Sequence, residues 1–288
     1  MVTATETENT NRAAAWLLLG VLGGLGLDLC AKEILRSYSL LEFILVRSGV
    51  AIVIMLAIAP RFGGYAALRT RRAGWHLLRA ICAIGAMYGF FYGLAHMPLI
   101  NALTLGYTAP LMVTALAAIF LGEPVGARRW SAVIVGFGGV LIMLRPGGGE
   151  VSLAAVAVLA AAFFYACQAI TARHLGATET TLSLMFYVVA GPFVTTIGLI
   201  DRADWIPPDL AGWSLMICAA SCSVVAWVGF VNGYRAASPA TLAPLEYTAL
   251  VGGALAGYVF WDEVPDTWVV VGATVIVASG VFVMRRAR

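Results

Sequence analysis

The chain has 288 residues, of which 61% are hydrophobic and only 11% are charged, and its mean hydropathy is +0.90. A soluble domain is typically ~45–50% apolar and ~25% charged. A soluble core could not bury this much apolar side chain, so the composition indicates a protein whose solvent is the lipid bilayer. The formal charge of +3 requires no nucleic-acid partner.

The N-terminal region and the cysteines exclude two further classes. Residues 1–12 are polar and lack the pattern of a cleavable signal peptide, so the first apolar segment is expected to be retained as a membrane span. The five cysteines lie in apolar segments and form no C-x-x-C pair. A disulfide framework, a metal site and a bound cofactor are therefore not expected.

Ten apolar segments approach the ~20 residues that a helix needs to cross the hydrocarbon of a bilayer. Their apolar runs are continuous and lack the period-two alternation of a transmembrane β-barrel, which favours helices. Glycine, proline and charged residues separate them, as between Arg61 and Gly64 or between Gly122 and Pro124. In chain order the expected spans are 13–31, 40–60, 75–95, 99–121, 130–145, 152–172, 181–200, 211–234, 239–261 and 268–284.

Basic residues in the loops give the orientation, because cytoplasmic loops carry an excess of Lys and Arg. If the N-terminus is inside, the cytoplasmic side carries twelve of these residues and the other side four, with Arg47 and Arg79 left out because they fall in or near spans. We therefore expect a multi-pass protein of the cell (inner) membrane with both termini in the cytoplasm.

An internal repeat organises the chain. The segments Gly89–Pro124 and Gly229–Val264 align without a gap, 140 residues apart, and share nine identical residues, whereas apolar bias alone gives about three. The predicted units are repeat one at 13–146 and repeat two at 151–286, joined by Pro146–Glu150, in one integral membrane domain over 1–288. Five spans per repeat is an odd number, so the second repeat enters the membrane inverted, as in many secondary transporters.

Charged residues inside spans are candidate functional groups, because a central charge costs ~2.5–3.5 kcal/mol on insertion scales. Glu246, beside Pro239 and Pro244, could bind a substrate ammonium, carry a coupling proton, or form a structural pair. Asp28 is a second possible coupling residue, although its spacing from Lys32 favours a pair on the helix surface. Arg47 is expected to orient a carboxylate or helix-end carbonyls, and Arg79 to be an interfacial anchor.

Several motifs resemble those of the drug/metabolite transporter (DMT) superfamily, specifically its ten-span EamA-type members, which include amino-acid exporters of the YddG type. The resemblance covers nearly the whole chain. The second copy departs from the pattern, because Trp261-Asp-Glu263 replaces Gly-Glu and Leu250 stands where a proline would be. The motifs are Arg47, Phe90–Pro98, Tyr107-Thr-Ala-Pro110, Leu121-Gly-Glu-Pro124, Arg128-Arg-Trp130 and Gly136-Phe-Gly-Gly139.

This resemblance implies an all-α membrane protein in which two inverted five-helix repeats surround a central cavity. Spans 1, 3, 4, 6, 8 and 9 would line the cavity, and spans 5 and 10 would pack outside it. Aromatic and polar residues crowd these spans and suit an amphipathic solute. The predicted substrate-binding residues are Tyr88, Phe91, Tyr92, Asn101, Thr104, Tyr107, Thr108, Phe164, Tyr165, Gln168, Trp227, Phe230, Asn232, Glu246 and Tyr247.

The function expected from these features is secondary transport of a small organic solute, with export of amino acids or related metabolites by alternating access as the leading hypothesis. The protein is expected to act as a monomer. Alternatives are another amphipathic metabolite, cofactor or drug as substrate, a lipid-modifying enzyme, or a channel. No nucleotide-binding motif is present, and the three histidines are scattered, which disfavours ATP drive and an enzyme.

Overall fold

The computed structural model describes residues 4–145, 152–175, 178–201, 203, 205–236, 242 and 245–285, and over these residues its regular structure is entirely helical. The predicted all-α fold class is confirmed. Two short 3₁₀ turns, η1 (Ala59–Phe62) and η2 (Tyr65–Leu68), lie between the second and third helices. The α-helices are α1 (Ala4–Ile34), α2 (Leu40–Ile58), α3 (Ala73–His96), α4 (Leu99–Gly106), α5 (Ala109–Phe120), α6 (Ala127–Leu144), α7 (Leu153–Leu175), α8 (Thr181–Leu199), α9 (Leu210–Ala236), α11 (Thr248–Trp261) and α12 (Thr267–Arg285).

Most of the spans expected from the sequence match these helices within a few residues, although α1 begins at Ala4, nine residues before the first expected span. Nine segments of the described chain are long and apolar enough to cross a membrane, and the apolar helix Thr248–Trp261 is shorter. The fourth expected span, 99–121, is not one continuous helix but two, α4 and α5, broken at Tyr107 and Thr108. The predicted linker 146–150 and residues 239–241 of the ninth expected span lie outside the described residues, as do Pro239 and Pro244.

Local capping explains where several helices begin. Ser39 precedes α2 and forms a capping box with Glu42, in which each side chain bonds the other residue's backbone amide. Before α9, Asp209 accepts a hydrogen bond from the Gly212 amide at 2.7 Å, and Asp266 does the same before α12 for Val269 at 2.9 Å. These side chains satisfy amide groups that a helix leaves unpaired in its first turn.

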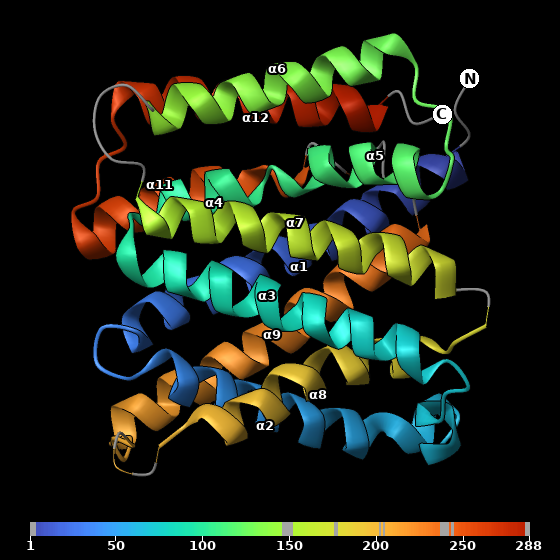
Figure 1. Ribbon diagram of the computed structural model, residues 1–288, viewed down its shortest axis with the longest axis vertical. Coiled ribbons are helices and arrows are strands. Elements are labelled where there is room, and N and C mark those ends of the chain that lie inside the picture. The colour runs from blue at the N-terminus through green and yellow to red at the C-terminus, as the bar shows by residue number, and fades with distance from the viewer. Residues whose placement is uncertain are drawn as a thin grey trace.

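The helices lie roughly side by side, and α1 begins at the same end of the molecule at which α12 ends (Figure 1). We call this the terminus end. It also holds the connections from α2 to α3 and from α5 to α6, whereas the α1–α2, α3–α4 and α11–α12 connections lie at the opposite end (Figure 1). The arginine-rich segment 61–72 is therefore at the terminus end.

Helix pairing follows a two-fold pattern. The closest pairs are α1 with α9, α3 with α7, and α6 with α12. In span order these are the first with the eighth, the third with the sixth, and the fifth with the tenth, so exchanging the two repeats returns the same set of pairs. Spans 5 and 10, which are α6 and α12, lie together at one edge, as the family resemblance implies (Figure 1).

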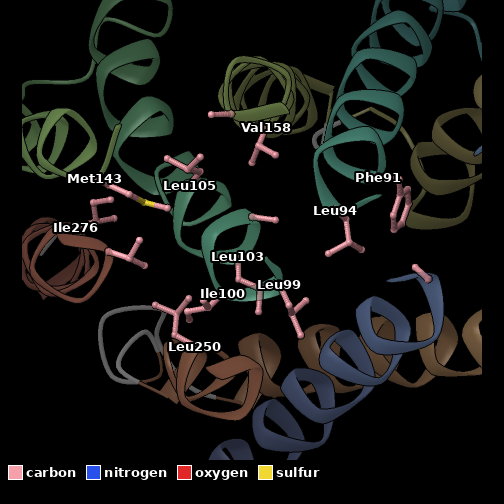
Figure 2. Packing of buried hydrophobic residues seen from close by; sticks show 14 of the residues in the cluster. Phe91, Leu94, Leu99, Ile100, Leu103, Leu105, Met143, Val158, Leu250 and Ile276 are labelled. Carbon is pink, nitrogen blue, oxygen red and sulfur yellow. The ribbon is translucent and has the colours of Figure 1, made fainter. Parts of the chain in front are cut away.

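The largest buried apolar cluster lies toward the opposite end. It includes the last turns of α1 and α3 and the first turns of α2, α4, α7 and α9. Figure 2 shows Phe91 and Leu94 of α3 facing Leu99 and Leu103 of α4 within this cluster. The buried clusters nearer the terminus end are smaller; one of them holds Ala13, Leu17 and Leu242. The apolar core is thus concentrated at the end away from the termini.

Candidate functional site

Corresponding positions of the two repeats meet at the centre of the molecule. Thr108 precedes α5, and its hydroxyl donates to the Leu105 carbonyl at 2.6 Å; the hydroxyl of Thr248, 140 residues later, donates to the Leu245 carbonyl at the same distance. The rings of Tyr107 and Tyr247 lie 5.0 Å apart. The interruption of the fourth span therefore has a counterpart at the start of α11, and the two lie in contact.

A hydrogen bond joins these two positions. The Tyr107 hydroxyl donates to the backbone carbonyl of Glu246 at 2.7 Å. In a continuous helix that carbonyl would accept a bond from its own helix, so an interruption needs a partner of this kind when water is absent. The tyrosine of one repeat thus stabilises the irregular backbone of the other.

A cavity of about 470 Å³ lies beside these interruptions. Its volume falls within the ~300–1,000 Å³ typical of small-molecule sites. Its walls come from the middle parts of α3 and α7, the junction of α4 and α5, and single residues of α1, α2 and α8, together with Glu246. The family resemblance implied spans 1, 3, 4, 6, 8 and 9; instead the second and seventh spans, α2 and α8, contribute Arg47 and Val188, and α9 contributes none of the lining residues.

The charged side chains that the described part of the chain contributes to the cavity wall are two carboxylates, Asp28 and Glu246, and one guanidinium, Arg47. Arg47 lies against α3, where its Nη1 is 3.6 Å from the Met87 sulfur and its Cζ is 5.7 Å from the centre of the Phe91 ring. Its buried Nε has no hydrogen-bond partner in the described part of the chain. A buried donor without a partner is costly in a protein.

Six of the predicted site residues line this cavity together. They come from both repeats and include both candidates for coupling. They are Asp28, Phe91, Tyr107, Tyr165, Gln168 and Glu246.

The other predicted site residues do not line it, and most have partners elsewhere. The Tyr88 hydroxyl pairs with Thr196 at 2.6 Å, and the Tyr92 ring stacks on His96 with a centroid distance of 4.3 Å. The Asn232 amide donates to its own helix, at the Val228 carbonyl, over 2.8 Å. The remaining residues outside the cavity wall are Asn101, Thr104, Thr108, Phe164, Trp227, Phe230 and Tyr247.

The cavity also contains residues that the sequence did not single out. Phe90 and Met87 add apolar wall, and Gly106 leaves the Phe90 ring close to the backbone, at 3.4 Å from where a β-carbon would stand. Small residues of α3 and α7, such as Ala83 and Ala161, leave space for the cavity between these helices. From the sequence alone, Phe90, Met87 and the alanines look like ordinary packing residues. Arg47 was identifiable because it places a charge inside a span.

Two expectations about basic residues are wrong. Lys32 does not pair with Asp28; its Nζ lies 2.6 Å from Glu263 Oε1, since the end of α1 meets the α11–α12 connection. Arg79 is not an exposed interfacial anchor but is 5% exposed, and donates to the carbonyls of Gln168 at 2.7 Å and Leu184 at 3.2 Å. Its position between α3, α7 and α8 uses the guanidinium to satisfy backbone acceptors.

Polar contacts close the opposite end around Glu263. Besides the ion pair with Lys32, Glu263 accepts a bond from the Leu99 amide at 2.7 Å, at the start of α4. Lys32 also donates to the Met97 carbonyl at 3.0 Å. Further contacts between the repeats at this end join Trp261 to Glu33, Tyr38 to Asp209, Glu42 to Ile206 and Arg145 to Asp266.

Comparison with known proteins identifies similar chains along nearly the full length. The chain is 28% identical over 282 residues to a riboflavin transporter of Vibrio cholerae, covering 94% of this chain and 92% of that one. It is 27% identical over 257 residues to the pseudopaline exporter CntI of Pseudomonas aeruginosa, covering 88% and 89%. It is 26% identical over 271 residues to an S-adenosylmethionine uptake transporter of Rickettsia bellii, covering 93% and 92%.

A solved crystal structure has the same fold. It superposes with a TM-score of 0.64 at 16% sequence identity, over 93% of this chain and 96% of the other. The model of the EamA-like transporter family matches residues 11–145 and again residues 152–285. These similar proteins carry the names of transporters and not of enzymes. The chain therefore belongs to the EamA-like transporter family of the drug/metabolite transporter superfamily.

Proposed function

We propose that the chain is a secondary transporter that exports amino acids or related metabolites by alternating access. The observation that carries this proposal is the central cavity, where Arg47, Asp28 and Glu246 face one space with aromatic walls. A guanidinium suits a substrate carboxylate, and a carboxylate suits a substrate ammonium. An amino acid presents both groups, and Phe91, Tyr107 and Tyr165 supply apolar surface for its side chain.

The distribution of basic residues supports placing the terminus end in the cytoplasm. The connection between α2 and α3 carries Arg61, Arg69, Arg71 and Arg72 and lies at that end. Positive charge in short loops marks the cytoplasmic side of a membrane. On this assignment the protein is a multi-pass protein of the inner membrane, acts as a monomer, and has its opposite end facing outward.

The packing of the helix ends supports assigning this structure to an inward-facing state. The buried cluster and the Lys32–Glu263 pair lie between the cavity and the outward end. The second repeat is related to the first by inversion, so a symmetric rearrangement that loosens this end and closes the terminus end would give the outward-facing state. Asp28 or Glu246 would carry the coupling proton between the two states.

A second candidate substrate is a larger amphipathic metabolite or cofactor. Two observations favour it: the aromatic wall, which includes Phe90 and Phe91, and the names of the similar proteins, which refer to riboflavin and S-adenosylmethionine. A planar ring system could stack on these side chains.

The test is transport by the purified protein in liposomes. Labelled amino acids and riboflavin are offered one at a time, with and without an imposed proton gradient, and protein-free vesicles serve as the blank. We expect an amino acid to accumulate, and Glu246→Gln to reduce its movement or the effect of the gradient. Movement of riboflavin alone would favour the second candidate. A result in which none of these solutes moves contradicts both.

A further inference from the structure

We infer that the preferred substrate is a zwitterion with an additional cationic group, so that it carries a net positive charge. This inference rests on the proposed function and concerns the same cavity. Its basis is an imbalance of charge: among the residues that the structure describes, two carboxylates, Asp28 and Glu246, line the cavity with a single guanidinium, Arg47. Arg47 can compensate only one of them.

Two other basic residues of the described spans, Lys32 and Arg79, are already engaged. Lys32 is bound to Glu263 and to the Met97 carbonyl, and Arg79 is bound to the carbonyls of Gln168 and Leu184. The sequence from 236 to 245, next to Glu246, contains no basic residue. No residue of the described chain forms an ion pair or a hydrogen bond with the carboxylate of Asp28 or Glu246.

An uncompensated carboxylate inside a membrane protein is costly and must be neutralised or paired. A substrate with one carboxylate and two cationic groups resolves the imbalance. Its carboxylate would meet Arg47, whose Nε lacks a partner in the described part of the chain, and its two cations would meet Asp28 and Glu246.

The aromatic residues near Glu246 suit a cation as well. Tyr107 and Tyr165 line the cavity together with Glu246, and the Tyr107 hydroxyl donates to the Glu246 carbonyl. The faces of aromatic rings attract cations at distances up to ~6 Å. A diamino acid therefore fits this wall better than an amino acid with an alkyl side chain of the same length.

The experiment compares lysine with norleucine, which has the same carbon chain without the terminal ammonium. Uptake of labelled lysine into liposomes holding the wild-type protein is measured in competition with unlabelled lysine or norleucine. We expect lysine to compete about tenfold better, the effect of one charge-assisted hydrogen bond. Because the competition uses the wild type, no variant has to fold for this result.

Variants then test whether Glu246 is responsible for the preference for lysine over norleucine. Glu246→Gln should reduce the advantage of lysine over norleucine to about threefold or less, since a neutral amide is a weaker partner for an ammonium. The matched control is Asp201→Asn, which removes one carboxylate from an exposed connection outside the cavity. This control should keep the wild-type preference.

The outcomes separate the two proposals. Equal competition by norleucine, or a Glu246→Gln variant that retains the full preference for lysine, overturns the inference about charge while amino-acid transport stands. Transport of riboflavin without transport of lysine overturns the inference and favours the neutral candidate. If neither probe moves, the inference is overturned, and the amino-acid proposal itself fails only if none of the other labelled amino acids moves either.

Discussion

Glu179, at the terminus end, joins the two repeats through its side chain. The Thr70 hydroxyl donates to it at 2.8 Å and the Ser183 hydroxyl at 3.2 Å, and the His76 ring nitrogen lies 3.2 Å away. Burial acts to raise the pKa of this carboxyl, but the bonds from Thr70, His76 and Ser183 outweigh it and hold the pKa below its ordinary value of 4.5. The bonds therefore favour the charged form.

This shift predicts a loss of stability in acid. A lowered pKa in the folded state stabilises the protein above the unfolded pKa, and this contribution disappears as the pH falls through the folded pKa. Thermal unfolding in detergent at pH 7 and at pH 4 should show Glu179→Gln less stable than the wild type at pH 7. At pH 4 the difference should be smaller. A difference that stays constant or grows in acid would contradict the assignment.

Tyr107 donates a hydrogen bond from the first repeat to the backbone of the second. Tyr107→Phe keeps the ring against Tyr247 but leaves the Glu246 carbonyl without its donor. We expect transport to fall roughly three- to tenfold, the effect of about one net hydrogen bond. The measurement is the initial rate of uptake. Tyr258→Phe, on a side chain that is 60% exposed, is the control and should transport as the wild type does.

The sequence predicted part of the site at this scale. Asp28, Gln168 and Glu246 were identifiable because polar groups in spans are rare, and each lines the cavity. Thr108 and Asn232 were equally polar but bond to carbonyls of their own segments. Whether a polar residue faces the cavity or bonds within its own helix depends on how that helix is rotated about its axis. Spans that are apolar on all sides give little information on this rotation.

At the scale of elements, helix ends were more predictable than the interruption of the fourth span. Capping residues and glycine-proline turns are local signals, so most of the expected boundaries hold to within a few residues. The interruption at Tyr107 and Thr108 has a local contribution from Pro110, which has no amide hydrogen to donate to the Gly106 carbonyl four residues earlier. Its other partner, the Glu246 carbonyl that accepts the Tyr107 hydroxyl, is far away in the sequence and could not be predicted.

The α1–α9 pair supplies a test of close helix packing. A β-carbon on Gly23 would stand 2.5 Å from the Ala226 amide nitrogen and 2.8 Å from the Cys222 carbonyl oxygen. On Gly24 it would meet nothing within 4 Å. Both atoms near Gly23 belong to backbone, so neither can move without displacing a helix.

Gly23→Ala is therefore expected to destabilise the protein, whereas Gly24→Ala should be neutral or slightly stabilising because alanine favours helix. The readout is the melting temperature in detergent and the monodisperse yield after purification. If both variants lose stability equally, or if neither does, then α1 does not pack more closely on α9 at Gly23 than at Gly24.

At the scale of the whole molecule, the sequence predicted the two-fold design but not the conformational state. Nine identities and an odd number of spans were enough to predict inverted repeats, and the pairing of α1 with α9 and of α3 with α7 has that symmetry. The departure from symmetry, a buried apolar cluster that is larger at one end over the described residues, could not be predicted. It depends on which of two nearly equivalent packings the chain adopts.

Glu263 is one of the charged residues that connect the two repeats at this end. It is bound to Lys32 of α1 and to the first amide of α4, so separating the repeats at this end must break both contacts. A pair this shielded from water leaves an uncompensated charge when one partner is removed. Glu263→Gln should therefore shift the protein toward states that are open at this end.

Hydrogen–deuterium exchange of the intact protein measures this shift. In Glu263→Gln the peptides covering 94–106 should exchange faster than in the wild type, while those covering 65–80 at the terminus end should not. The control Asp262→Asn changes the adjacent carboxylate, and asparagine tolerates the left-handed backbone at that position, φ 55°. Faster exchange at both ends would indicate general destabilisation, and unchanged exchange at 94–106 would show that the ion pair does not hold this end closed.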